Sequence, residues 1–432
     1  MKRYPTLFNI LCTLAYASMI LWIYEIQILR WWSYSGFDGG VSSFKAITCL
    51  LISAVLAMLL PTGTTSRAIL LTILHYAFFV PSVVILTTNR VVLEYPISIM
   101  VAYVILKIFS TFKINAVVVA ELRPRQMLFL LSGMVSLAIL IQIAFGGLSH
   151  FNLNLERVYE FRRVAAAELP TIFGYLYSNV TNVLIPTSLV MAVIYRSNFL
   201  IACIVLASVV LFGMTHHKSV FFTPFIVLIL FFIFNRVDSA AQLGWIFVSL
   251  PAIALIEIFF IDQVAQIDIP GFFSSYAIRR SLLVPPMLDK IFVEFFTENP
   301  KYYWSSSRFS FGLIQSPSDV SASFLIGREF FGDNDMSANT GMVGSGFSNS
   351  GVLGVALYAA ITGILISILD GQGRRLGHSF VASIAVMLIS YISTSTDLTT
   401  ALLTHGLFML LIVLSIAPKS ISMVMAHKRV NK

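Results

Sequence analysis

The chain has 432 residues, of which 58% are hydrophobic and only 11% are charged, with a formal net charge of +8. Ordinary soluble domains carry about 25% charged residues. A soluble protein this apolar could not cover its own surface, so a soluble enzyme or binding domain is excluded and lipid is the expected solvent. The three cysteines lie far apart in apolar runs without metal-ligand spacing, so we expect no metal and no cofactor.

Apolar segments follow one another along nearly the whole chain. Crossing a bilayer takes about 20 mostly apolar residues. Segments near that length lie at 6–29, 44–61, 67–87, 92–112, 126–146, 171–194, 199–214, 219–235, 243–261, 349–369, 379–396 and 400–417. The sequence therefore predicts an all-α polytopic membrane protein of about twelve transmembrane helices, forming one integral membrane domain over 1–432. The first segment has no small-residue cleavage site, so we interpret it as a retained helix.

Lysines and arginines in the short loops set the orientation, because they are enriched on the cytoplasmic side. With the N-terminus inside, that side receives Lys2, Arg3, Arg67, Lys113, Arg123, Arg125, Arg196, Arg236, Arg374 and Arg375. The short loops opposite receive chiefly Arg30, Lys45, Arg90 and Lys218. Both termini are therefore predicted to be cytoplasmic, and two longer segments, 147–170 and 262–348, are predicted to be outside.

Both outer segments carry arginine clusters. The first contains Arg157, Arg162 and Arg163, and the second contains Arg279 and Arg280. Guanidinium groups form forked, charge-assisted hydrogen bonds to phosphate oxygens. We interpret the two clusters as a phosphate site for a lipid head group or a lipid-linked pyrophosphate. The alternative is that these arginines only anchor the loops to head groups.

The long outer segment contains RRSLLVPPMLDKIFVEFFTENP, which predicts a helix entered at Pro285–Pro286 and ended at Asn299–Pro300. Its predicted apolar face is made of Leu288, Ile291, Phe292 and Phe295, with Asp289, Lys290 and Glu294 pointing elsewhere. Such an amphipathic helix either lies on the membrane surface or caps a cavity between the spanning helices. Tyr302, Tyr303 and Trp304 follow as candidate interfacial aromatics.

The helix over 171–194 carries polar residues at helical spacing. They are Thr171, Tyr175, Asn179 and Asn182. Polar groups in a spanning helix usually face the bundle interior or a wet cavity. Amides and phenols suit ligands rich in hydroxyl groups, so Tyr175, Asn179 and Asn182 are candidate sugar-binding residues. The alternative is plain hydrogen bonding between helices.

His216, His217 and Lys218 form a turn at the predicted outer end of a helix. A histidine there accepts a proton near neutral pH, and the lysine is a candidate phosphate ligand. Adjacent histidines on a helix point about 100° apart, which makes a metal chelate a poor interpretation. Interfacial histidines without a catalytic role remain the alternative.

A glycine-rich stretch, NDMSANTGMVGSGFSNSGVLGVALYAAITG, leads into a later helix. No strand precedes it and no GK[ST] follows, so a nucleotide-binding loop is excluded. Small residues here predict close backbone approach to neighbouring helices or ligand. Asn339, Thr340 and Asn349 are its polar members.

In layout and in four stretches the sequence resembles the O-antigen polymerases (Wzy-type), which join oligosaccharide repeat units. The stretches are the first-loop arginines followed by GYLYSNVTNVLIP, the THHKS turn, RRSLLVPPMLDKIFVEFFTENPKYYWSSS, and ANTGMVGSGFSNSGVLG. Arg163 and Gly174 have ten residues between them, and Arg328 and Gly344 have fifteen, which fits arginine–glycine spacings described for the family. The resemblance covers most of the chain after about residue 150.

The resemblance implies a GT-C-like, inverting, metal-independent glycosyltransferase of the bacterial inner membrane. Donor and acceptor would be undecaprenyl-pyrophosphate-linked glycans joined at the periplasmic face, and a chain-length regulator is an expected protein partner; no nucleic acid is expected. On this interpretation Arg157, Arg162, Arg163, Arg279, Arg280 and Lys218 bind pyrophosphate, Tyr175, Asn179, Asn182 and Asn339 bind sugar, and His217 or His216 is the base. The alternatives are an O-antigen ligase of the same fold and, from another class, a repeat-unit flippase or transporter.

Overall fold

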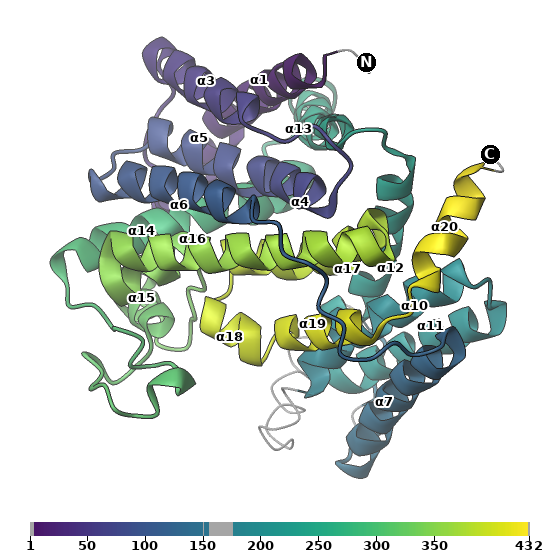
Figure 1. Ribbon diagram of the computed structural model, residues 1–432. Helices are drawn as coiled ribbons and strands as arrows, with labels where there is room; N and C mark the ends of the chain where they lie inside the picture. Colours follow the sequence, from purple (N-terminus) through teal and green to yellow (C-terminus); the bar gives the residue numbers. More distant parts are fainter. Residues whose placement is uncertain (1–3, 150, 155–175, 431–432) are drawn as a thin grey trace. The chain divides into compact units, whose positions relative to one another are not determined.

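The computed structural model describes residues 4–149, 151–154 and 176–430, with side chains described as far as residue 425. Within these ranges all regular secondary structure is helical (Figure 1). The predicted phosphate ligands Arg157, Arg162 and Arg163, and the predicted sugar ligand Tyr175, lie outside the described residues.

Eight of the described helical segments are long and apolar enough to cross a membrane, which confirms a helical, membrane-embedded protein. They are Pro5–Ser35, Ser66–Thr88, Pro124–Ala144, Leu176–Ile194, Asn198–Thr215, Lys218–Arg236, Ala240–Ala265 and Met342–Leu376. Three shorter apolar helices are Ser43–Met58, His378–Thr394 and Leu407–Ile416. The number of twelve spans and the GT-C-like fold stay predictions.

The chain divides into two compact units, each built from separate stretches of sequence. Unit 1 comprises 1–112, 237–367 and 389–399, and unit 2 comprises 113–236, 368–388 and 400–432. The helices α16 (Met342–Leu376) and α17 (His378–Thr394) contribute residues to both units.

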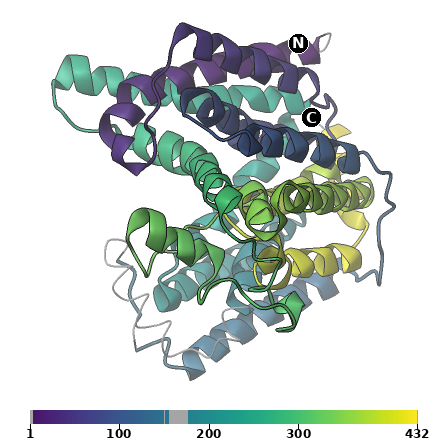
Figure 2. The same cartoon turned by 90° about the vertical axis from the view of Figure 1, so that its left-hand side faces the viewer.

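Unit 1 is built from helices of three separate stretches of the chain. Its elements are α1 (Pro5–Ile23), η1 (Tyr24–Ile28), α2 (Leu29–Trp32), α3 (Ser43–Met58), α4 (Ser66–Leu74), η3 (His75–Phe79), α5 (Val80–Thr88), α6 (Glu94–Ser110), α13 (Leu243–Phe259), η6 (Phe260–Ala265), η7 (Ser274–Leu283), α14 (Val284–Glu298), α15 (Ala322–Phe331) and most of α16. Helix α1 packs against α3 and α13, as Figures 1 and 2 both show. Pro5 suits the first turn of α1, because a proline there loses no intrahelical hydrogen bond. The Thr65 hydroxyl caps α4 by accepting a hydrogen bond from the Ala68 amide at 3.1 Å.

Unit 2 surrounds one buried helix. Its elements are α7 (Pro124–Ala144), η4 (Val180–Leu184), α10 (Ile185–Ile194), α11 (Asn198–Thr215), α12 (Lys218–Arg236), α19 (Leu407–Ile416) and α20 (Ser420–Val430), and the short α18 (Leu398–Leu403) runs into it from unit 1. Helix α10 packs against α7, α11 and α12 and is buried along almost its whole length. Such a helix, apolar all round, is expected at the centre of a bundle.

Helix α16 is broken inside the glycine-rich stretch. Ser350 and Gly351 are non-helical, and Gly351 has φ +60°, a conformation open to glycine because it has no Cβ. The halves 342–349 and 352–376 meet so closely that a Cβ on Gly354 would lie 2.0 Å from the Gly346 carbonyl oxygen. A Cβ on Gly341 would lie 2.2 Å from the Ser393 carbonyl carbon. The prediction that these glycines allow close backbone approach is therefore confirmed.

Replacing Gly354 with alanine should destabilise the protein by about 1–3 kcal/mol or more. The added methyl group would collide with the backbone at Gly346, and no change of side-chain rotamer can relieve a collision with backbone. Gly133→Ala in α7 is the matched control, since nothing lies within 4 Å of its Cβ position. The apparent Tm of each purified variant in detergent measures the effect. Equal melting of Gly354→Ala and Gly133→Ala would contradict the close packing of the two halves.

Candidate functional site

The predicted arginine pair lies on η7, a wide helical segment of unit 1. The Arg279 guanidinium sits over the Trp32 ring, with its Cζ 4.5 Å from the ring centroid. Its Nε is buried without a hydrogen-bond partner. Burial lowers the pKa of Arg279, and the positive charge of exposed Arg280 lowers it further. The structure thus presents one stacked cation beside one solvent-facing cation, an arrangement that favours an anion.

Segment η7 is attached to the membrane helix α13 at its start. The Glu257 carboxylate accepts hydrogen bonds from the backbone amides of Phe272 and Phe273, both at 2.8 Å. There is no room for a side chain at Gly271, where a Cβ would lie 2.6 Å from Glu257 Oε2. A carboxylate at the N-terminal end of a helical segment is favourable because it meets unpaired N–H groups. This contact holds the arginine segment in place on unit 1.

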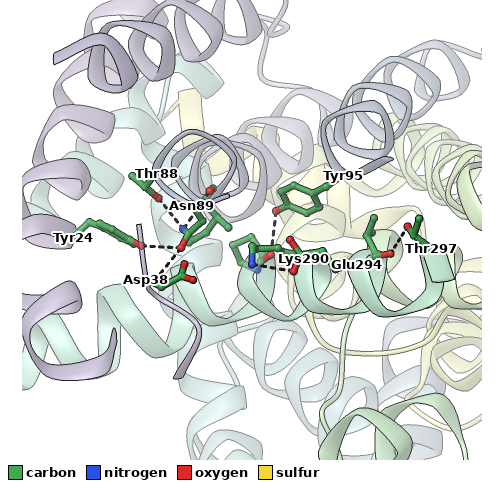
Figure 3. A network of polar contacts seen from close by, with 11 residues as sticks. Tyr24, Asp38, Thr88, Asn89, Tyr95, Lys290, Glu294 and Thr297 are labelled. Carbon is green, nitrogen blue, oxygen red and sulfur yellow. Dashed lines mark hydrogen bonds and ion pairs between the residues drawn. The ribbon is translucent and has the colours of Figure 1, made fainter. Parts of the chain in front are cut away.

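The helix predicted after the arginine pair is present as α14, but its polar side is not exposed. Asp289 is fully buried and Lys290 is 8% exposed, so the prediction that they point away from the packed face is wrong. The reason is tertiary: α14 packs against α5, α6 and η7 and is enclosed on more than one side. Lys290 Nζ pairs with Glu294 at 3.0 Å, and the Tyr95 hydroxyl donates to the Pro286 carbonyl at 3.0 Å (Figure 3).

Asp289 connects α14 to the broken helix α16. Its Oδ1 accepts hydrogen bonds from the Thr340 hydroxyl and from the Gly344 amide, the latter at 2.8 Å. Its Oδ2 is buried without a hydrogen-bond partner. Burial raises the pKa of Asp289 to about 7, although both hydrogen bonds act in the opposite direction. The carboxyl therefore joins the outer segment to the start of the half-helix 342–349.

The three predicted interfacial aromatics differ in exposure. Tyr302 is 1% exposed, so the prediction is wrong for this residue, whereas Trp304 is half-buried and Tyr303 is 55% exposed. Trp304 Nε1 donates to the Tyr358 hydroxyl at 3.0 Å, and that hydroxyl donates to Asp397 Oδ2 at 2.7 Å. Asn349 Oδ1 accepts from the Trp304 amide at 2.9 Å. This network fixes the 302–304 turn to α16.

Asn179 and Asn182, the predicted sugar ligands in unit 2, face the turn between α18 and α19. Asn182 Nδ2 donates to the His405 carbonyl at 3.0 Å. Asn179 Oδ1 lies 3.6 Å from the Cβ position of Gly406, whose φ is +103°. Residues Val180–Leu184 form a π-helical turn, a feature common at functional sites. Both asparagines are half-buried, and one already uses its amide in helix packing.

The two histidines of the predicted catalytic turn differ in environment. His216 ends α11 in a left-handed conformation with φ +55° and is 1% exposed. His217 is half-buried, and its ring centroid lies 5.0 Å from that of Tyr177. Lys218 is exposed at the start of α12. Of the two, only His217 has access to a ligand from solvent, so it is the better candidate for a proton acceptor.

The predicted site residues fall into separate groups. Asn179, Asn182, His216, His217 and Lys218 belong to unit 2, whereas Arg279, Arg280 and Asn339 belong to unit 1. Asn339 is exposed and accepts a hydrogen bond from the Ser337 hydroxyl at 3.0 Å, while its neighbour Thr340 is buried.

Sequence reasoning missed a polar seam in unit 1 between α1 and the α4–η3–α5 helix. Thr13 Oγ1 lies 2.9 Å from His75 Nε2, and the Tyr16 hydroxyl donates to the Tyr76 carbonyl at 2.8 Å. Asn9 is fully buried, with neither side-chain polar atom paired. The signal was available in the spacing of polar residues along α1, namely Asn9, Thr13 and Tyr16, continued by Tyr24 and Gln27 in η1.

Neither a metal site nor a known relative identifies the chemistry of these residues. Among the described residues no group of three or more histidine, cysteine or acidic side chains is arranged to hold a metal ion. Comparison with protein-family models, curated proteins and solved structures finds no match to this chain.

Proposed function

We propose that the protein is a membrane glycosyltransferase that polymerises undecaprenyl-pyrophosphate-linked repeat units at the periplasmic face of a bacterial inner membrane. The observation that supports it best is the arginine pair Arg279–Arg280, stacked on Trp32 and attached to a membrane helix through Glu257. Cationic donors held in place before reaction suit a leaving group that gains negative charge. The same pair suits the donor of an O-antigen ligase.

In the proposed reaction, the hydroxyl at the non-reducing end of the acceptor attacks the anomeric carbon of the donor glycan. The new C–O bond forms as the bond to undecaprenyl pyrophosphate breaks, with inversion at that carbon. The acceptor hydroxyl proton passes to a base, and the negative charge leaves with the pyrophosphate. Arg279 and Arg280 would stabilise that charge without a metal, and the enzyme would also hold both lipid-linked substrates together.

Replacing His217 with alanine should lower polymerisation by about two to four powers of ten if this imidazole accepts the acceptor proton. The pH profile is the sharper measurement, because loss of a base that acts only when deprotonated should remove the fall in activity toward acidic pH. His216→Ala tests the neighbouring imidazole, and because His216 is buried we expect it to lower the amount of folded protein and leave the pH profile of the remaining activity unchanged. An unchanged pH profile in His217→Ala would remove the residue from the mechanism.

The function is tested by deleting the gene and separating the surface polysaccharide on a gel. A polymerase predicts lipid A cores that carry a single repeat unit. Loss of all attached repeats, with long chains still made on the lipid carrier, would identify a ligase. Unaltered surface polysaccharide would overturn both.

A transport function, such as a repeat-unit flippase, is the second candidate. It is favoured by His75, which is fully buried near the middle of the apolar helix Ser66–Thr88 and bonded to Thr13. Ionisable groups inside membrane helices often mark transport pathways. A flippase predicts that deletion leaves undecorated cores and repeat units trapped on the cytoplasmic face.

A further inference from the structure

A cavity of about 330 Å³ lies within the outer segment of unit 1, separate from the arginine pair. It is formed by the end of α14, the turn that follows, the 317–318 loop and α15. Its lining is Phe295, Phe296, Asn299, Pro300, Tyr302, Pro317, Ser318, Leu325, Arg328 and Glu329. This volume is at the small end of ligand sites and suits roughly one or two sugar rings.

The walls of the cavity are held by specific contacts. The Tyr302 hydroxyl donates to the Val320 carbonyl at 2.7 Å, which connects the turn after α14 to the loop before α15. The Tyr302 amide donates to the Ser348 carbonyl at 2.9 Å. Asn299 Nδ2 donates to the Phe295 carbonyl at 2.7 Å and closes the end of α14. These contacts fix the walls of the cavity, including the 317–318 loop, to α14 and α16.

Charge decides against an anionic ligand. Arg328 Nη1 lies 3.5 Å from Asp319 Oδ1, and its Nε lies 3.1 Å from Glu329 Oε1. Within the lining Glu329 balances Arg328, and Asp319, which is outside the lining, adds a second carboxylate beside the same guanidinium, so no excess of positive charge is left for phosphate or pyrophosphate. Glu329 instead accepts hydrogen bonds from hydroxyl groups, and the guanidinium donates to hydroxyl or ring oxygens.

The apolar part of the lining complements the C–H faces of a sugar ring. A pyranose ring carries C–H groups on its faces and hydroxyls around its edge. Aromatic rings and proline rings, such as those of Phe295, Tyr302 and Pro317, offer flat apolar surfaces to such a face, while Asn299, Arg328 and Glu329 offer polar groups to the edge. Lipid chains would offer no hydrogen bonds to the remaining donors and acceptors of these polar groups.

We propose that this cavity binds a neutral sugar of the glycan chain and holds the growing polymer between additions. The inference rests on the proposed function, since it places a glycan on the same side as the arginine pair. A subsite that retains the chain lengthens the time a donor stays bound. Weakening it should shorten the polymer without abolishing bond formation.

Filling the cavity tests this directly. Leu325→Trp places a bulky ring in the cavity, and Phe330→Trp is the matched control, because Phe330 is 50% exposed on the same helix and is not part of the lining. The full-length protein in nanodiscs is titrated with oligosaccharides cut from the host's own surface polysaccharide and freed of lipid, with saturation-transfer NMR as the readout. Binding should weaken at least tenfold in Leu325→Trp and stay unchanged in Phe330→Trp. In cells, the modal chain length should fall.

Glu329→Gln, a surface change that keeps the fold, should weaken binding about three- to tenfold. Arg280→Ala should retain oligosaccharide binding while losing polymerisation, which separates this cavity from the catalytic proposal. Wild-type binding in both cavity variants, no binding by active wild-type protein, or competition by inorganic pyrophosphate would overturn the sugar site. Unchanged polysaccharide after gene deletion would instead overturn the proposed function.

Discussion

Replacing Arg280 with alanine is expected to lower the rate of polymerisation by about two to three powers of ten. The exposed guanidinium is free to reach the leaving pyrophosphate, whose negative charge grows as the glycosidic bond breaks. Arg280→Lys should recover only part of the rate, because an ammonium group cannot form the forked pair of hydrogen bonds. The measurement is the polysaccharide ladder of a deletion strain carrying each variant at equal protein level.

Arg308→Ala is the matched control, since it removes an exposed arginine from the same outer segment. If the arginine pair acts only by attracting anionic lipid, Arg279→Ala, Arg280→Ala and Arg308→Ala should have similar, small effects. Full-length polymer at wild-type rate in both Arg279→Ala and Arg280→Ala would contradict the pyrophosphate assignment. Arg279→Ala should also loosen the stack on Trp32, which a shift in tryptophan fluorescence would report.

Replacing Asp289 with asparagine should make the protein more stable than the wild type at neutral pH, with the difference shrinking as the pH falls. Burial raises the pKa of Asp289 from its ordinary value of 3.8 to about 7. Below pH 3.8 the carboxyl is protonated in both states. Between pH 4 and 7 the unfolded chain loses the proton and the folded protein keeps it, so folding stability falls as the pH rises.

Each pKa unit corresponds to about 1.4 kcal/mol, so this group removes at most about 4 kcal/mol of stability across that window. Asparagine cannot ionise but still accepts hydrogen bonds from Thr340 and Gly344. The apparent Tm of both proteins in detergent at pH 4.5 and pH 7.5 measures the difference, with Asp335→Asn as the control for an exposed carboxyl of the same segment. A Tm difference that does not depend on pH would show that Asp289 is ionised in the folded protein.

Individual residues show where sequence reasoning succeeded and where it failed. The helix over 284–298 was predicted from its prolines and apolar spacing and is present. The exposure of Asp289 and Lys290 was mispredicted, because a helical pattern assigns one buried face and α14 is enclosed by several elements. The interfacial position predicted for Tyr302 rested on a run of aromatic residues, whereas its burial depends on packing against Ser348, which lies far along the chain.

The sequence by itself determined that the chain is helical and membrane-embedded, because composition and apolar run length report directly on the solvent. It also singled out Arg279, Arg280, His217 and the glycines of α16, since charge and the absence of a side chain are local properties. Only the tertiary structure decided that Arg279 stacks on Trp32 and that Asp289 accepts a hydrogen bond from Thr340. The same holds for the hydrogen bond from Asn182 to the His405 carbonyl. These pairings join residues from about 50 to about 250 positions apart, and contacts at such separation depend on packing that no local pattern records.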